Sequence, residues 1–155
     1  IIEFINRTED SPEHKGQVDH ALIHEIGQET DEEYYKALSL IQFREVEREI
    51  KIVYTPLHGT GHIPVMQMLE RKGYEVYEVE EQSFPDEDFV NTKSPNPEDD
   101  EAYELAVLMA EKKGADIILA TDPDCDRLGV MVRLNGNYVR LTGNQLGALF
   151  LKYII

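Results

Sequence analysis

Three aspartates, Asp122, Asp124 and Asp126, alternate within five residues, and Arg127 follows the third of them directly. Carboxylates this close repel one another, so the segment is costly to fold unless a cation neutralises it. Hard oxygen ligands favour Mg²⁺, Mn²⁺ or Ca²⁺ over softer metals. We therefore expect the three aspartates to hold one divalent cation, and the alternative is a solvated acidic loop without a metal.

The same alternation opens the calcium loop of an EF-hand, which needs glycine at its sixth position and glutamate at its twelfth. Arg127 and Arg133 occupy those positions here, and a strand rather than a helix is predicted next, so we reject an EF-hand. Arg127 itself allows two interpretations. It could form a structural ion pair with the aspartates, or it could contact a phosphate beside the metal through its planar guanidinium.

A second segment of possible interest is the turn 57–61, which contains His58, Gly59 and Gly61. It is not a P-loop, because no Gly-Lys-Ser/Thr follows, and Pro64 stands where a dinucleotide fingerprint has its third glycine. A phosphate could still bind at the start of the helix that follows. Glycines that serve only a tight turn are the simpler interpretation, and the sequence assigns no role to His58.

Hydrophobic patterns predict the elements that position these residues. Strands are expected at 51–55, 74–79, 116–120, 128–134 and 138–141. Helices are expected at about 31–45, from 62 to 72, after 97 up to Gly114, and from 143 onward. The first two strands flank a helix and should be parallel, whereas Asn135 and Gly136 predict a hairpin.

The aspartates come directly after the continuously apolar run 116–120, and ligands of open α/β sheets gather outside the carboxyl ends of strands. We therefore predict an α/β fold of three layers. A central mixed, mostly parallel sheet would be flanked by helices, and the domain would end in a β-hairpin and a helix. Capping residues predict three of the helix starts: Thr30 with Glu33, Asn96 with Pro97, and Thr142 with Gln145.

Composition limits the partners. The formal net charge is −16, and so acidic a surface repels nucleic acids and anionic membranes. No apolar run approaches the roughly 20 residues that span a bilayer. A single cysteine, Cys125, rules out an internal disulfide and suits a reducing compartment. We expect a cytoplasmic protein whose partners include neither nucleic acid nor membrane.

Four segments, taken in order, resemble the second domain of the α-D-phosphohexomutases, and most closely the phosphoglucomutase/phosphomannomutase branch. They are 55–61 (TPLHGTG), 94–98 (SPNPE), 120–129 (ATDPDCDRLG) and 141–147 (LTGNQLG). The resemblance covers about residues 50–147. One departure is Cys125, where the family often has glycine or alanine.

The resemblance implies a four-domain enzyme that interconverts hexose 1-phosphate and hexose 6-phosphate through a bisphosphorylated sugar. On that analogy Asp122, Asp124 and Asp126 are the Mg²⁺ ligands, and a phosphoserine carried by the first domain supplies a further oxygen. Arg127 would act catalytically, near the phosphoserine and the substrate phosphate.

The domain boundaries expected on this basis are a helical lead-in at 1–48 from a missing first domain, the metal-binding domain at 49–142, and a helix at 143–155 that leads to a missing third domain. The serine-histidine-asparagine-proline motif of the family's active site is not in this sequence. We therefore expect the chain to be inactive without the other domains, which would be its partners together with a phosphosugar. The alternative is a stand-alone cation-binding or interaction module without catalysis.

Overall fold

The computed structural model describes residues 19–155, so the first part of the predicted lead-in, residues 1–18, lies outside the described residues. The chain divides into two compact units, Ile1–Ile41 and Gln42–Ile155. The second unit contains the sheet and all three aspartates, and it is the unit that bears on function.

In the first unit, helix α2 (Gln28–Ser39) follows the short 3-10 helix η2 (His20–Leu22). The predicted capping box of Thr30 and Glu33 is wrong, because the helix begins earlier, behind Gly27, and no side chain caps it. The helix also ends before the predicted residue 45. The apolar side chains that follow it are exposed, so a further turn would gain little from burial.

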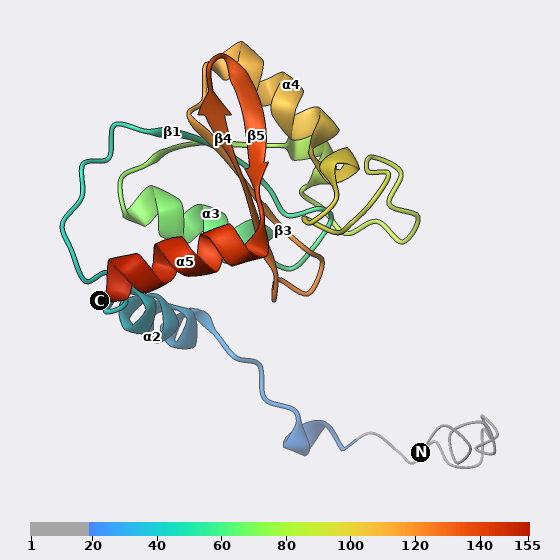
Figure 1. Cartoon of the computed structure of the whole chain (residues 1–155). Helices are drawn as coiled ribbons and strands as arrows, with labels where there is room; N and C mark the ends of the chain where they lie inside the picture. The colour runs from blue at the N-terminus through green and yellow to red at the C-terminus, as the bar shows by residue number, and fades with distance from the viewer. Residues whose placement is uncertain (1–18) are drawn as a thin grey trace, which may run out of the picture. The chain divides into compact units, whose positions relative to one another are not determined.

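The second unit is built on one mixed sheet in the order β2-β1-β3-β4-β5 (Figure 1). Its strands are β1 (Lys51–Thr55), β2 (Glu75–Glu78), β3 (Ile117–Thr121), β4 (Leu128–Leu134) and β5 (Asn137–Leu141). Strand β1 pairs in parallel with β2 and β3, whereas β3–β4 and β4–β5 are antiparallel. Only β4 runs against the other four, which confirms the predicted mixed α/β sheet.

Helices cover both faces of the sheet. Helix α4 (Glu104–Lys113) contributes Ala106 and Ala110 to a cluster of buried side chains with Val53 of β1 and Ile118 of β3. Neighbouring residues of a strand point to opposite faces, so Tyr54 faces the other way. Its hydroxyl lies against Gly61, which precedes helix α3 (His62–Arg71). The predicted three layers follow from this arrangement.

The helix predicted after Asn96 and Pro97 begins later than expected. Asn96 caps only a turn, in which its side chain accepts the N–H of Glu98 at 3.1 Å. A 3-10 helix, η4 (Asp100–Tyr103), comes next, and α4 starts at Glu104. The Tyr103 hydroxyl donates to the carbonyl of Pro97 at 2.8 Å, a contact within the segment that precedes the helix.

The C-terminal elements agree with their sequence signals. Asn135 and Gly136 have φ of 51° and 86°, as a tight hairpin turn requires. Thr142 and Gln145 form a complete capping box at the start of helix α5 (Gly143–Ile154). Although α5 is strongly apolar, no helix within residues 19–155 is both long and apolar enough to cross a bilayer.

Two glycines give a matched test of this packing. A methyl group at Gly129 in β4 would collide with the Tyr103 hydroxyl and lie 2.6 Å from the Pro97 carbonyl oxygen, whereas one at Gly147 in α5 meets nothing within 4 Å. We expect Gly129→Ala to lower the free energy of unfolding by about 1–3 kcal/mol. Gly147→Ala should raise it by roughly 0.5–1 kcal/mol, since alanine favours a helix interior. Urea denaturation measures both, and an unchanged Gly129→Ala midpoint would contradict this packing.

Candidate metal centre

The aspartate loop begins where the buried strand β3 ends. Ile118 and Ala120 are fully buried in β3, and they anchor the strand that delivers Asp122 to the edge of the sheet. A tight turn follows, in which the Cys125 N–H donates to the Asp122 carbonyl at 3.0 Å. Cys125 has a φ of 62°, a conformation that glycine adopts at less cost.

The turn brings the three carboxylates together. One oxygen from each of Asp122, Asp124 and Asp126 lies within 4.8 Å of the others. Asp122 is only 7% exposed, while the other two are open to solvent. One carboxylate is therefore held by the fold, and the remaining two can adjust around a shared ligand.

The electrostatics of the loop are those of crowded negative charge. The pKa of Asp126 is raised, chiefly by the charge of Asp124 and then by a hydrogen bond to Asp122 and its charge, while Arg127 acts in the opposite direction. The backbone N–H of Arg127 donates to Asp122 Oδ1 at 2.9 Å. Its Nε lies 3.5 Å from Asp122 Oδ2 and 3.9 Å from Asp126 Oδ1.

Arg127 offsets only part of this charge, and its side chain is 57% exposed. One cationic group faces three carboxylates, and all the donor atoms are hard oxygens. Such a donor set fits a small divalent cation that prefers oxygen, such as Mg²⁺. The exposed guanidinium keeps most of its N–H donors for another anion, so the ion pair and the phosphate contact considered for Arg127 do not exclude each other.

The turn after β1 packs directly against the aspartate loop. The Thr60 N–H donates to the carbonyl of Pro123 at 2.8 Å, and a methyl group at Gly59 would lie 2.7 Å from that same oxygen. Glycine at position 59 therefore permits close backbone contact. The sequence alone had favoured a simple turn here, and it held no local signal for a contact between segments more than 60 residues apart.

A second contact supports the base of the loop. The hydroxyls of Tyr54 and Thr121 lie 2.9 Å apart in the interior, and burial raises the pKa of Tyr54. A methyl group at Gly61 would lie 2.7 Å from Thr121 Oγ1 and 2.9 Å from Cys125 Sγ. Gly61 thus leaves room for the side chains at both ends of the aspartate turn, and Cys125 fills part of that space.

The other two segments that carried the family resemblance also meet in space. The 94–98 loop lies against Gly129 through Pro97, and a methyl group at Gly143 would lie 3.9 Å from Glu98 Oε1. The structure thus joins 55–61 to the aspartate loop and 94–98 to β4, and it places Glu98 near the start of α5.

Comparison with known proteins shows which family this domain resembles. The family model described as phosphoglucomutase/phosphomannomutase, alpha/beta/alpha domain II, matches residues 32–136. A phosphoglucomutase of Staphylococcus epidermidis strain ATCC 12228 is 38% identical over 87% of this chain and 25% of its own length. A phosphoglucomutase of Staphylococcus aureus strain USA300 is 41% identical over 69% of this chain and 20% of its own length.

A solved structure shares the fold. It is a phosphoglucomutase/phosphomannomutase family protein from Burkholderia thailandensis, which superimposes with a TM-score of 0.67 at 21% identity over 81% of this chain and 26% of that one.

The fold and the family model together define an α/β/α domain of an enzyme family. The chain belongs to the phosphoglucomutase/phosphomannomutase family, and its matched part is domain II. It spans between a fifth and a quarter of the length of the curated relatives it matches.

The raised pKa of Asp126 gives a direct test of the loop. Because Asp124 is the largest cause, we expect Asp124→Asn to lower the pKa of Asp126 toward its ordinary value. The folded domain binds the Asp126 proton more tightly than the unfolded chain does. Repulsion between Asp124 and Asp126 therefore destabilises the fold once the pH rises through the raised pKa of Asp126. Titration followed by carboxyl ¹³C NMR measures the change. Glu87→Gln, at an exposed residue, should leave it unaltered, and an unchanged pKa in Asp124→Asn would show that the carboxylates are not crowded.

Proposed function

We propose that this chain is the metal-binding domain of a phosphohexomutase, most closely a phosphoglucomutase/phosphomannomutase that interconverts hexose 1-phosphate and hexose 6-phosphate. The observation that carries the proposal is the convergence of Asp122, Asp124 and Asp126 at the carboxyl end of β3, in a domain that belongs to this family. A cytoplasmic location accompanies the proposal, since the lone Cys125 suits a reducing compartment.

Each residue has a distinct role in this proposal. The three aspartates hold Mg²⁺, and Asp122 orients the group because it is buried and accepts the Arg127 N–H. Bound Mg²⁺ neutralises charge on the transferring phosphoryl group. Arg127, catalytic in this proposal, uses its exposed N–H donors to orient a phosphate oxygen in the bidentate manner that guanidinium favours.

The reacting phosphate must come from outside this chain. We propose that a phosphoserine on another domain faces the aspartate loop and exchanges its phosphoryl group with the sugar, which passes through a bisphosphorylated form. The first relative matched is four times as long as the aligned segment, which supports partnership with other domains of the same polypeptide. This chain by itself is therefore proposed to be inactive.

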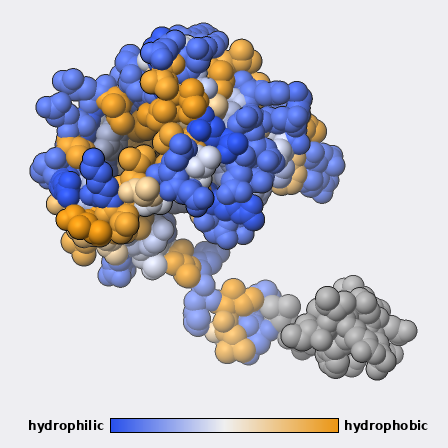
Figure 2. Space-filling view, in the orientation of Figure 1, coloured by the Kyte–Doolittle hydropathy of each residue, from blue (hydrophilic) through white to orange (hydrophobic). Residues whose placement is uncertain are grey.

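An exposed apolar surface also favours such partners. Figure 2 shows apolar side chains gathered over the end of α5, with other apolar areas higher on the same face. Helix α5 carries four apolar side chains that are each more than half exposed, namely Leu149, Phe150, Leu151 and Ile154. Water-exposed apolar patches of this kind mark interaction sites, and the occupant proposed here is a further domain of the same enzyme.

The first test is metal binding by the 155-residue chain. We expect weak Mg²⁺ affinity, in the millimolar range rather than the submicromolar, because three mutually repelling carboxylates lack the phosphate oxygen that completes the site. NMR titration should shift the amides of residues 122–127, and isothermal calorimetry sets the limit on affinity. Submicromolar binding would favour a stand-alone cation-binding module, and no response at all would favour a solvated acidic loop.

The second test uses the full-length enzyme. Asp124→Ala should reduce conversion of glucose 1-phosphate to glucose 6-phosphate by at least about a thousandfold, because loss of a ligand removes the metal's stabilisation of phosphoryl charge. The thermal midpoint should change little, since Asp124 is exposed. The matched control is Asp88→Ala, at another exposed aspartate, and it should retain wild-type turnover. Wild-type turnover in Asp124→Ala would refute the metal role.

A further inference from the structure

The turn that contacts the aspartate loop is backbone-strained. Leu57 and His58 have φ of 47° and 63°, and residues with a Cβ rarely adopt such values. Two consecutive residues in this region persist only where the surrounding structure holds them. Leu57 is fully buried and His58 is only 6% exposed, so the groups that hold the turn are in the interior of the domain.

The buried residue Gln82 supplies part of that support, through its backbone and through its side chain. Gln82 ends the 3-10 helix η3 (Glu80–Gln82) and is 1% exposed. Its carbonyl accepts the His58 N–H at 2.7 Å, and its side-chain Oε1 accepts the Thr55 hydroxyl at 2.6 Å. Gln82 therefore contacts the chain on both sides of the first strained residue, Leu57.

The hydrogen bonds around Gln82 fit one assignment of donors and acceptors. The Thr55 hydroxyl oxygen accepts the Leu57 N–H at 3.2 Å, which leaves its proton free for Gln82 Oε1. The amide nitrogen of Gln82 donates to the Asn91 carbonyl at 2.8 Å. Each polar atom of the Gln82 side chain thus has the partner that its chemistry requires, and the amide orientation is determined by its neighbours.

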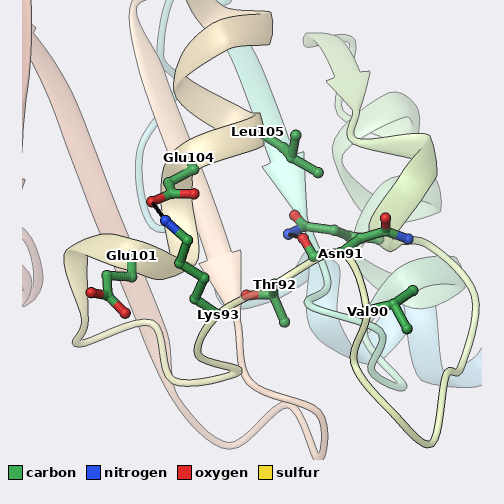
Figure 3. Close-up of a pocket in the computed structure, with 8 residues that line it drawn as sticks. Val90, Asn91, Thr92, Lys93, Glu101, Glu104 and Leu105 are labelled. Atoms are coloured by element: carbon green, nitrogen blue, oxygen red, sulfur yellow. Dashed lines mark hydrogen bonds and ion pairs between the residues drawn. The ribbon is translucent and has the colours of Figure 1, made fainter.

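Asn91, which accepts the Gln82 amide, makes a hydrogen bond of its own. The side chain of Asn91 donates to the Glu81 carbonyl at 2.8 Å. Figure 3 shows the segment Val90–Lys93 beside the start of α4, with Lys93 joined to Glu104 by an ion pair of 2.5 Å. The segment that receives the Gln82 amide is therefore also linked to α4, through an ion pair at the surface.

The strained turn in its turn contacts the aspartate loop. Two residues after His58, the Thr60 N–H donates to the Pro123 carbonyl at 2.8 Å, and Gly59 lies in close backbone contact with Pro123. Pro123 stands between Asp122 and Asp124. We infer that Gln82 is a positioning residue: through the turn 57–60 it sets where Pro123 lies, and so it sets the spacing of the two carboxylates on either side.

This inference rests on the proposed metal site but is tested separately from it. Gln82→Met preserves the size of the side chain and removes its hydrogen bonds. Thr55→Val removes the hydrogen bond between Thr55 and Gln82 by changing Thr55 instead, and it serves as the second variant should Gln82→Met fold poorly. The matched control is Tyr138→Phe. It deletes one hydrogen bond of 2.6 Å, to the Ala115 carbonyl, at the opposite end of β3.

The first measurement is amide hydrogen exchange of the full 155-residue chain without metal. We expect exchange of the Thr60 amide to speed up roughly tenfold relative to the core amides in Gln82→Met and Thr55→Val, since one net hydrogen bond shifts such an equilibrium by about that factor. It should not do so in Tyr138→Phe. Unchanged Thr60 protection in both variants, or equal loss in the control, overturns the inference.

The second measurement is the Mg²⁺ dissociation constant from NMR titration of the same chains. It should rise about tenfold in Gln82→Met, the lower end of the loss seen when groups that orient metal ligands are removed, and it should stay at the wild-type value in Tyr138→Phe. A constant that stays at the wild-type value in Gln82→Met overturns the inference. Failure of the wild-type chain to bind Mg²⁺ contradicts the proposed metal site instead, and Thr60 exchange then decides the role of Gln82 alone.

Discussion

Repulsion among Asp122, Asp124 and Asp126 is the constraint on which the rest of this structure depends. One carboxylate oxygen from each lies within 4.8 Å of the others, and the raised pKa of Asp126 is its direct electrostatic consequence. Groups that repel separate unless the backbone between them is held. The buried strand before the loop and the turn that contacts it hold this backbone.

Support reaches the loop from two directions. Along the chain, β3 is buried between helical layers and delivers Asp122 with its side chain nearly enclosed. Across the fold, the strained turn at Leu57 and His58 contacts Pro123 and is held by the buried Gln82. Strain of this kind is common at functional sites, where surrounding structure compensates its cost. Stability of the fold and geometry of the site are therefore linked through the same few hydrogen bonds.

Several features follow from local sequence. Apolar and alternating runs predicted the five strands, because a strand that is buried in the fold carries apolar residues in its own sequence. Asn135 and Gly136 predicted the hairpin, and Thr142 with Gln145 predicted the start of α5, since these signals act within a few residues. The alternating aspartates singled out the candidate site for a similar reason: their crowding is a property of one short loop.

Other features were decided by contacts between distant segments. The glycines of the 57–61 turn meet Pro123 across more than 60 residues of sequence, and Gln82 has no sequence motif that marks it. Sequence by itself determined the strands and the charge of the loop. Tertiary structure alone decided how that loop is held, because long-range packing is not encoded in any one segment's pattern.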